Sequence, residues 1–219
     1  MTLFDHISKY PITIILAVVC TLIFLVQILV PSTTDTFVLQ SADALARPWT
    51  LITAIFLHGS PSHLFSNLFA LVMFGLILEN FIGAKRLLSV FLAAGFTASI
   101  AATFFYDSTL GASGAIFGVM GALAVLRPRL VVWVLGVPMP MIVASVVWLL
   151  IDLLGVFFPT DVANMAHIAG LLIGIVIGLV LRSSYLQNPV QKFPPAVSED
   201  VIDQWEDAYV KKKHDQRKE

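Results

Sequence analysis

Long apolar stretches, separated by prolines and short charged clusters, occupy most of residues 11–186, and no strand-like alternation stands out. A membrane-spanning helix needs about 20 mainly apolar residues to cross a hydrocarbon core of about 30 Å. Six uncharged stretches meet or nearly meet this length. They are Ile12–Val30, one between Arg47 and Glu79, Leu87–Tyr106, Ser108–Leu126, Leu130–Ile151 and Val162–Leu181. The pattern therefore predicts an all-α membrane protein, with a six-helix bundle over residues 11–186, an N-terminal segment (1–10) and a charged tail (187–219).

Charged residues are scarce and unevenly placed. They make up 12% of the 219 residues, about half of the ~25% typical of soluble domains, and almost half of them follow Gln191. So few charges cannot cover a water-exposed surface, which excludes a cytosolic enzyme and a disordered protein. The net charge of −1 lacks the basic surplus of a nucleic-acid-binding domain. The single cysteine, Cys20, excludes a disulfide framework or a cysteine-based metal site within one chain.

The positions of Lys and Arg predict the orientation, because these residues collect on the cytoplasmic side of a membrane. With both ends of the chain inside, every Lys and Arg except Arg47 is cytoplasmic. The Ile12–Val30 stretch exceeds the 7–15 residues of a signal-peptide core and no small-x-small cleavage site follows it, so we interpret it as a retained helix.

In the tail, Ser198 precedes a short segment whose residues Val201, Ile202 and Trp205 share one helix face. That segment either docks on the inner leaflet or a partner, or is a solvated tail without a specific role.

Two polar residues are expected at the same depth in the membrane. A helix from Ser113 to Leu126 has 14 residues and a length of about 21 Å, too short to cross. Its lower end is held at the interface by Arg127 and Arg129, so Ser113 would end inside the membrane, where irregular backbone requires a protein-lined, water-accessible cavity. His167 lies 15 residues before Arg182, or about 22 Å along a helix.

Stripes of small residues indicate that the helices carrying Ser113 and His167 touch. The stripes are Gly114, Gly118 and Ala122 on the first helix, and Gly170, Gly174 and Gly178 on the second. Their contact would bring Ser113 within hydrogen-bonding range of His167. A serine hydroxyl becomes a nucleophile when an adjacent base takes its proton, and histidine is the usual base. The alternative is plain helix packing, with a histidine bonded to a carbonyl.

A second polar pair, His63 and Asn67, shares a helix face at i and i+4. Asn67 lies 12 residues from Glu79, or about 18 Å, close to the level of Ser113. Both side chains donate hydrogen bonds, and donors aimed at the oxyanion of acyl transfer stabilise it by about 3–4 kcal/mol each. The alternative is an inter-helix polar clamp.

Three short motifs resemble those of the rhomboid intramembrane serine proteases. Gly111-Ala112-Ser113-Gly114 with Phe117-Gly118 is similar to the family's G-x-S-G element on the fourth helix. Ala166-His167-Ile168-Ala169-Gly170 is similar to its A-H-x-x-G element on the sixth, and His63-Leu64-Phe65-Ser66-Asn67 to its H-x-x-x-N element on the second. The resemblance covers about residues 10–182 and keeps the motifs in order.

The resemblance implies a role for each motif residue. Ser113 would attack a peptide carbonyl, and His167 would be the base of a dyad that lacks an acidic third member. The oxyanion hole would consist of the Ser113 backbone N–H with the side chains of His63 and Asn67, and Phe117 would pack on the catalytic imidazole. Asn164 lies outside these motifs, and its position three residues before His167 suggests that it orients His167 or a substrate carbonyl. Supporting positions would be Gly111, Gly114, Gly118 and Gly170.

Some residues do not follow the family pattern. Many members carry Trp-Arg in the loop after the first helix, whereas Trp49 is followed by Thr50 and the arginine is Arg47. Asp152 and Asp161 match no motif. Asp161 lies six residues before His167, which is not the same helix face.

The expected activity is cleavage of peptide bonds in or near transmembrane segments of other membrane proteins, within the lipid bilayer. The resemblance implies no cofactor, and no metal, since no carboxylate or thiol joins the two histidines and Asn67. We expect a multi-pass protein of a prokaryotic cell membrane whose active site opens toward the extracytoplasmic side. Two alternatives stay open: an inactive rhomboid-like protein that binds membrane clients, and a small transporter with His167 as a proton relay, against which no inverted repeat is visible. The sequence leaves substrate and oligomeric state open.

Overall fold

The computed structural model describes residues 11–134, 136–158 and 162–187. The chain divides into two compact units, Met1–Ser184 and Tyr185–Glu219, and the fold and site described below belong to the first. The expected tail helix after Ser198 and the residue Asp161 lie outside the described residues. The helices are α2 (Pro11–Leu29), α3 (Ser32–Phe37), α4 (Thr50–Thr53), α5 (Pro61–Ile82), α6 (Ala84–Ala102), α7 (Ser113–Leu126), α8 (Met141–Gly155) and α9 (Asn164–Gln187). Short elements complete the order: the strands β1 (Leu39–Gln40), β2 (Ser108–Thr109), β3 (Val131–Val134) and β4 (Val137–Pro140), and the 3₁₀ turns η1 (Ser41–Asp43) and η2 (Ala54–Phe56).

The structure confirms the prediction of a mostly helical protein with apolar helices long enough to span a membrane. Within the described part of the chain, four helices (α2, α5, α6 and α9) are long and apolar enough to cross a membrane. Two apolar helices are shorter: α7 has 14 residues and α8 has 15. The helix predicted from Ser113 to Leu126 has these bounds in the structure.

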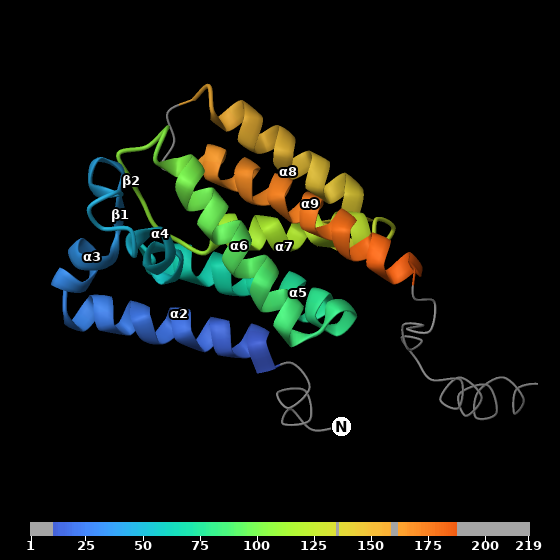
Figure 1. The fold of residues 1–219 in the computed structure, drawn as a ribbon, viewed down its shortest axis with the longest axis horizontal. Helices are drawn as coiled ribbons and strands as arrows, with labels where there is room; N and C mark the ends of the chain where they lie inside the picture. Colours follow the sequence, from blue (N-terminus) through green and yellow to red (C-terminus); the bar gives the residue numbers. More distant parts are fainter. Residues whose placement is uncertain (1–10, 135, 159–161, 188–219) are drawn as a thin grey trace, which may run out of the picture. The chain divides into compact units, whose positions relative to one another are not determined.

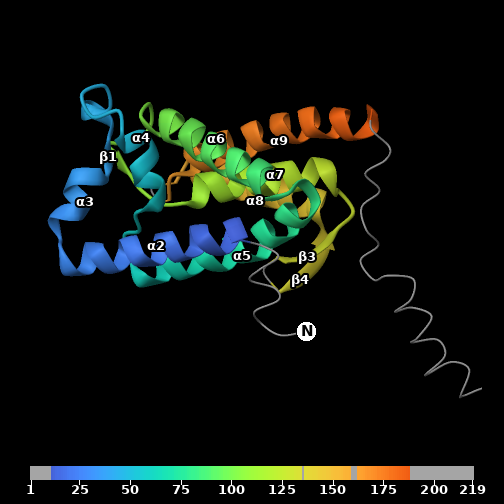
Figure 2. The same ribbon diagram turned by 60° about the horizontal axis from the view of Figure 1, so that its bottom comes forward.

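Helix α7 occupies the centre of the bundle and packs against α5, α6 and α8 (Figures 1 and 2). All its residues from Gly114 to Ala124 are buried. A helix that is apolar all round is one that is enclosed on every side. The outward faces of α2, α8 and α9 instead expose large apolar side chains such as Leu22, Leu150 and Val176, as expected of a surface that meets lipid.

The predicted helix over Leu130–Ile151 is wrong in its first half. Residues Val131–Val134 pair antiparallel with Val137–Pro140 as a hairpin, and α8 begins only at Met141. Two prolines in the second strand lack the N–H that a helix needs, and β-branched and aromatic residues fill the first strand. Gly136, with φ of 79°, adopts the left-handed conformation typical of tight hairpin turns.

The loop between α2 and α5 is tied to the segment that precedes Ser113. Strand β1 pairs antiparallel with β2, so that Leu39 lies opposite Thr109. Within the loop, the Arg47 guanidinium donates hydrogen bonds to the backbone carbonyls of Asp35, at 2.9 Å, and Thr36. Arg47 therefore fastens the loop to the end of α3.

A buried carboxylate joins the start of α2 to the C-terminal part of α5. Glu79 accepts hydrogen bonds from the Thr13 hydroxyl at 2.6 Å, from the Thr13 N–H at 2.9 Å and from the Ile12 N–H at 3.1 Å. The first N–H groups of a helix have no partner within it and attract negative charge. Glu79 supplies that charge from the neighbouring helix and so fixes where α2 begins against α5.

Candidate active site

Ser113 is the first residue of α7 and lies at the helix N-terminus. The first backbone hydrogen bond of this helix runs from the Ile116 N–H to the Ala112 carbonyl, at 3.0 Å. The N–H groups of Ser113, Gly114 and Ala115 come before that bond. Such groups at the start of a helix are not bonded within the helix and are available to other partners. The half-buried Ser113 hydroxyl thus lies beside backbone donors at the positive end of the helix dipole.

His167, on α9, faces Ser113. Its Nε2 atom lies 2.8 Å from the Ser113 Oγ, a normal hydrogen-bond distance. The Phe117 ring stacks on the imidazole, with centroids 4.3 Å apart and planes inclined by 12°. Trp148 of α8 packs edge-on against Phe117, with centroids 6.1 Å apart. Only 9% of His167 is exposed, so its orientation is set by these neighbours.

The predicted contact between the two small-residue stripes is confirmed. A Cβ added to Gly170 would collide with the Gly114 carbonyl oxygen, and one added to Gly174 would collide with that of Gly118. On the other side of α7, a Cβ at Gly118 would collide with Ala94 of α6. The missing side chains let α7 approach both neighbours at backbone distance, and this approach brings Ser113 to His167.

The structure places a carboxylate beside His167 that the sequence reasoning did not expect there. The Asp152 Oδ1 atom lies 3.0 Å from the His167 Nδ1 atom. The imidazole therefore has an acidic partner, contrary to the expected dyad without one. A signal was present: α8 and α9 are joined by a short connection, Asp152 lies three residues before the end of α8, and His167 lies three residues after the start of α9. In an antiparallel helix pair those positions share one level.

His63 lies against the turn that leads into Ser113. A Cβ added to Gly111 would lie 2.8 Å from the His63 Cε1 atom and 2.9 Å from its Nε2 atom. Gly111 has φ of 124° and donates its N–H to the Ala54 carbonyl at 2.9 Å. Only glycine combines this backbone conformation with so close a neighbour.

The two remaining polar candidates bond to nearby backbone. The buried Asn67 amide donates to the His63 carbonyl at 2.9 Å, one turn back on α5. Asn164 donates to the Val162 carbonyl at 3.2 Å and packs against Gly155. Asn164 thus ties the start of α9 to the end of α8.

A second histidine, His58, packs edge-on against His63, with ring centroids 5.2 Å apart. The Gln27 amide holds the His58 backbone, accepting from its N–H at 3.0 Å and donating to its carbonyl at 3.2 Å. Burial, helped by the nearby His63, lowers the pKa of His58 to about 4, so its ring is neutral at pH 7. Among the described residues, no three or more His, Cys, Asp or Glu side chains are grouped to hold a metal ion.

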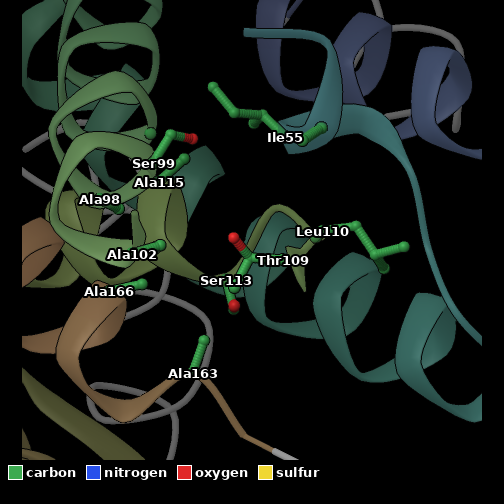
Figure 3. A pocket seen from close by; sticks show the side chains of 14 residues that line it. Ile55, Ala98, Ser99, Ala102, Thr109, Leu110, Ser113, Ala115, Ala163 and Ala166 are labelled. Atoms are coloured by element: carbon green, nitrogen blue, oxygen red, sulfur yellow. The ribbon is translucent and has the colours of Figure 1, made fainter. Parts of the chain in front are cut away.

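A small cavity of about 30 Å³ adjoins Ser113, large enough for a water molecule. Its walls are mostly small side chains, with Ser113 between Ala98, Ala102 and Ala166 on one side and Ile55 and Leu110 on the other (Figure 3). The serine hydroxyl thus borders a space that admits only small groups.

Comparison with known proteins identifies the family. Residues 45–184 match the rhomboid domain. The chain is 36% identical over 135 residues to the mitochondrial RHOMBOID-like protein 6 of Arabidopsis thaliana, covering 61% of this chain and 43% of that protein. It is 37% identical over 140 residues to the rhomboid protease GluP of Bacillus subtilis, covering 62% and 26%. It is 27% identical over 184 residues to the rhomboid protease GlpG of Haemophilus influenzae, covering 80% and 95%.

The Arabidopsis relatives are longer proteins, and the chain spans less than half of the length of each. The relatives come from a plant and from bacteria, so they do not favour the expected prokaryotic origin. The apolar helices and the domain match together identify an integral membrane protein. Because the matched domain spans more than half of the chain, this protein belongs to the rhomboid family.

Proposed function

We propose that this protein is an intramembrane serine endopeptidase that cleaves peptide bonds in or near transmembrane segments of other membrane proteins. The observation that carries the proposal is the 2.8 Å contact between the Ser113 Oγ and His167 Nε2 atoms at a buried helix N-terminus. Two of the relatives are named rhomboid proteases, which supports the same reading.

The reaction begins when His167 Nε2 takes the proton of the Ser113 hydroxyl as Oγ attacks the carbonyl carbon of the scissile bond. The imidazolium then gives this proton to the nitrogen of the leaving peptide, and an ester on Ser113 remains. A water molecule gives a proton to Nε2 and attacks the ester. The serine recovers its proton as the acid product leaves.

The oxyanion of each tetrahedral intermediate would bind at the N-terminus of α7, to the Ser113 N–H. His63 and Asn67 would add side-chain donors. His63 lies against Gly111, two residues before Ser113, which suits this role. Asn67 bonds to its own helix and would keep one of its two amide hydrogens for the oxyanion.

The cavity beside Ser113 supports a preference for a small side chain at the residue before the scissile bond. It is lined mostly by alanines and glycines and has a volume of about 30 Å³. Each excess methylene that a tight apolar pocket must accommodate changes the barrier by about 1–3 kcal/mol. Alanine or glycine at that position should therefore be cut well, and leucine or phenylalanine poorly.

We also propose six spans with both ends of the chain in the cytoplasm, α7 and α8 being the two short ones. The arginines that follow α7 lie at the end opposite Ser113, so a cytoplasmic position for them directs Ser113 toward the extracytoplasmic side. Deacylating water would enter from there.

The test is cleavage of a panel of single-span proteins by the purified full chain in lipid vesicles, with fragments identified by mass. We expect cleavage by the wild type and none by Ser113→Ala or His167→Ala. Ser89→Ala is the matched control, because Ser89 is an exposed serine on α6 whose hydroxyl bonds to the Lys85 carbonyl of its own helix, and it should cleave like the wild type. Fragments that persist in Ser113→Ala would refute the proposal, and binding of the panel without cleavage by any form would favour a client-binding protein.

A further inference from the structure

Helix α8 presents a single buried face to the bundle, and Asp152 lies on it. The buried residues of α8 are Met141, Ala144, Ser145 and Asp152, positions that recur at helical spacing. Asp152 is 3% exposed, and its Oδ1 atom lies 3.0 Å from His167 Nδ1. The opposite ring nitrogen, Nε2, lies 2.8 Å from the Ser113 Oγ.

We propose that Asp152 is a positioning residue that completes a Ser113–His167–Asp152 triad, and this inference rests on the proposed peptidase function. The three side chains come from α7, α9 and α8 and form one continuous line of hydrogen bonds. Asp152 acts through His167 and does not touch the reacting atoms.

The carboxylate selects the productive form of the imidazole. A neutral imidazole carries its hydrogen on one of two nitrogens, and an ionised carboxylate only accepts hydrogen bonds. Asp152 therefore holds the hydrogen on Nδ1, which leaves the Nε2 lone pair facing the Ser113 hydroxyl. The other tautomer would point an N–H at Ser113, and the ring could not take the serine proton.

The same contact stabilises the charge that His167 gains during the reaction. When Nε2 takes the serine proton, the ring becomes positive while Nδ1 still donates to Asp152. The carboxylate stays ionised and takes no proton, as in soluble serine proteases of the Ser-His-Asp type. The positive charge of the His167 ring and the negative charge of the buried Asp152 carboxylate then compensate each other.

The position of Asp152 argues for this role over a structural one. A carboxylate buried in a membrane bundle is costly unless it is paired. Within the described part of the chain, its second oxygen, Oδ2, has no hydrogen-bond partner. The contact with His167 is therefore the compensation that the structure offers, and a carboxylate of purely structural use would be expected to engage both oxygens.

The first test measures the tautomer of His167 directly and needs no substrate. The full chain, ¹⁵N-labelled at histidine in lipid nanodiscs, is compared with Asp152→Asn, Asp152→Ala and Ser145→Ala, and the His167 signals are assigned by their loss in His167→Gln. Ser145 lies on the same helix face and is about equally buried, and its hydroxyl has no hydrogen-bond partner among the described residues, so Ser145→Ala should keep the wild-type spectrum. We expect the Nδ1–H form in the wild type and a shift toward the Nε2–H form in Asp152→Ala. Equal tautomer populations in the wild type and both Asp152 variants would overturn the proposal.

The second test is kinetic. In Ser-His-Asp proteases, replacing the acid by its amide lowers kcat by about 10⁴-fold, and we expect Asp152→Asn and Asp152→Ala to lower kcat at least tenfold with little change in KM. Asp152→Glu should recover part of the loss, and Ser145→Ala should behave like the wild type. An active wild type with undiminished kcat in both variants would overturn the triad while leaving the peptidase intact, whereas an inactive wild type would overturn the proposed function. Thermal unfolding of each variant identifies any that loses activity by misfolding. In that case the tautomer spectrum of the nearly isosteric Asp152→Asn decides whether Asp152 sets the tautomer of His167.

Discussion

The turn before Ser113 offers a sharp test of how the fold supports the site. Gly111 has φ of 124°, and an added Cβ would lie 2.8 Å from the His63 Cε1 atom. Non-bonded carbons prefer separations of about 3.5–4.0 Å, so in Gly111→Ala the methyl group and the imidazole must separate by about 0.7 Å. The backbone at residue 111 is held by its bond to the Ala54 carbonyl, so the turn cannot yield without breaking that bond.

Two costs follow from this geometry. A non-glycine residue in this backbone region is strained by about 1–3 kcal/mol, and forcing a methyl group into a filled space costs about 1–3 kcal/mol more. Either Ser113, two residues on, or the proposed oxyanion donor His63 is displaced. A displacement of about 1 Å at a reacting group costs about 100-fold in rate, so we expect Gly111→Ala to lose about 10- to 100-fold in kcat/KM.

The assay is cleavage of one alanine-containing single-span substrate, with thermal unfolding recorded on the same preparations. Gly83→Ala is the matched control, because Gly83 also has positive φ, 79°, but an added Cβ there would meet no atom of another described residue within 4 Å. It should lose stability through backbone strain alone, about 1–3 kcal/mol, and keep its kcat/KM. If Gly111→Ala cleaves as fast as Gly83→Ala, the close packing of His63 on this turn has no bearing on catalysis.

Three further outcomes follow from the packing. Gly174→Ala should lower both the unfolding temperature and the activity, because its methyl group would collide with the Gly118 carbonyl and push α9 away from α7; unchanged activity would show that the helices need not touch. Glu79→Ala should destabilise the fold by about 1–3 kcal/mol for each buried donor left unsatisfied, since the Thr13 hydroxyl and two N–H groups of α2 bond to it, and denaturant titration measures this loss. The pKa of His58 is lowered from 6.5 to about 4 by burial, so the unfolded chain binds the extra proton between these values. Its contribution to stability is therefore complete above about pH 6.5 and declines as the pH falls toward 4, and His58→Phe should remove that part of the pH dependence of unfolding.

The sequence predicts the elements whose position depends on length and spacing. The bounds of α7 follow from Ser113 and the arginines after Leu126, because a 14-residue helix fixed at one interface must end inside the membrane. The contact between α7 and α9 follows from glycines at four-residue intervals. Such features depend on residue spacing within a single stretch of sequence, so the sequence of one chain is enough to predict them.

Other features depend on relations between elements. Apolar length alone does not distinguish a helix from the hairpin that the prolines and Gly136 impose before α8. Asp152 matches no motif in the sequence, and its pairing with His167 depends on the register of α8 against α9. The backbone bond of Asn67 depends on a side-chain rotamer, which sequence spacing does not determine.

The central claim is that the Ser113 hydroxyl is activated by His167. The most direct measurement is covalent labelling of the full chain with a fluorophosphonate, with the modified residue mapped by peptide mass spectrometry. The account predicts a single adduct on Ser113 that is lost in His167→Ala and retained in Ser89→Ala. An adduct on another residue, or undiminished labelling of Ser113 in His167→Ala, would contradict it.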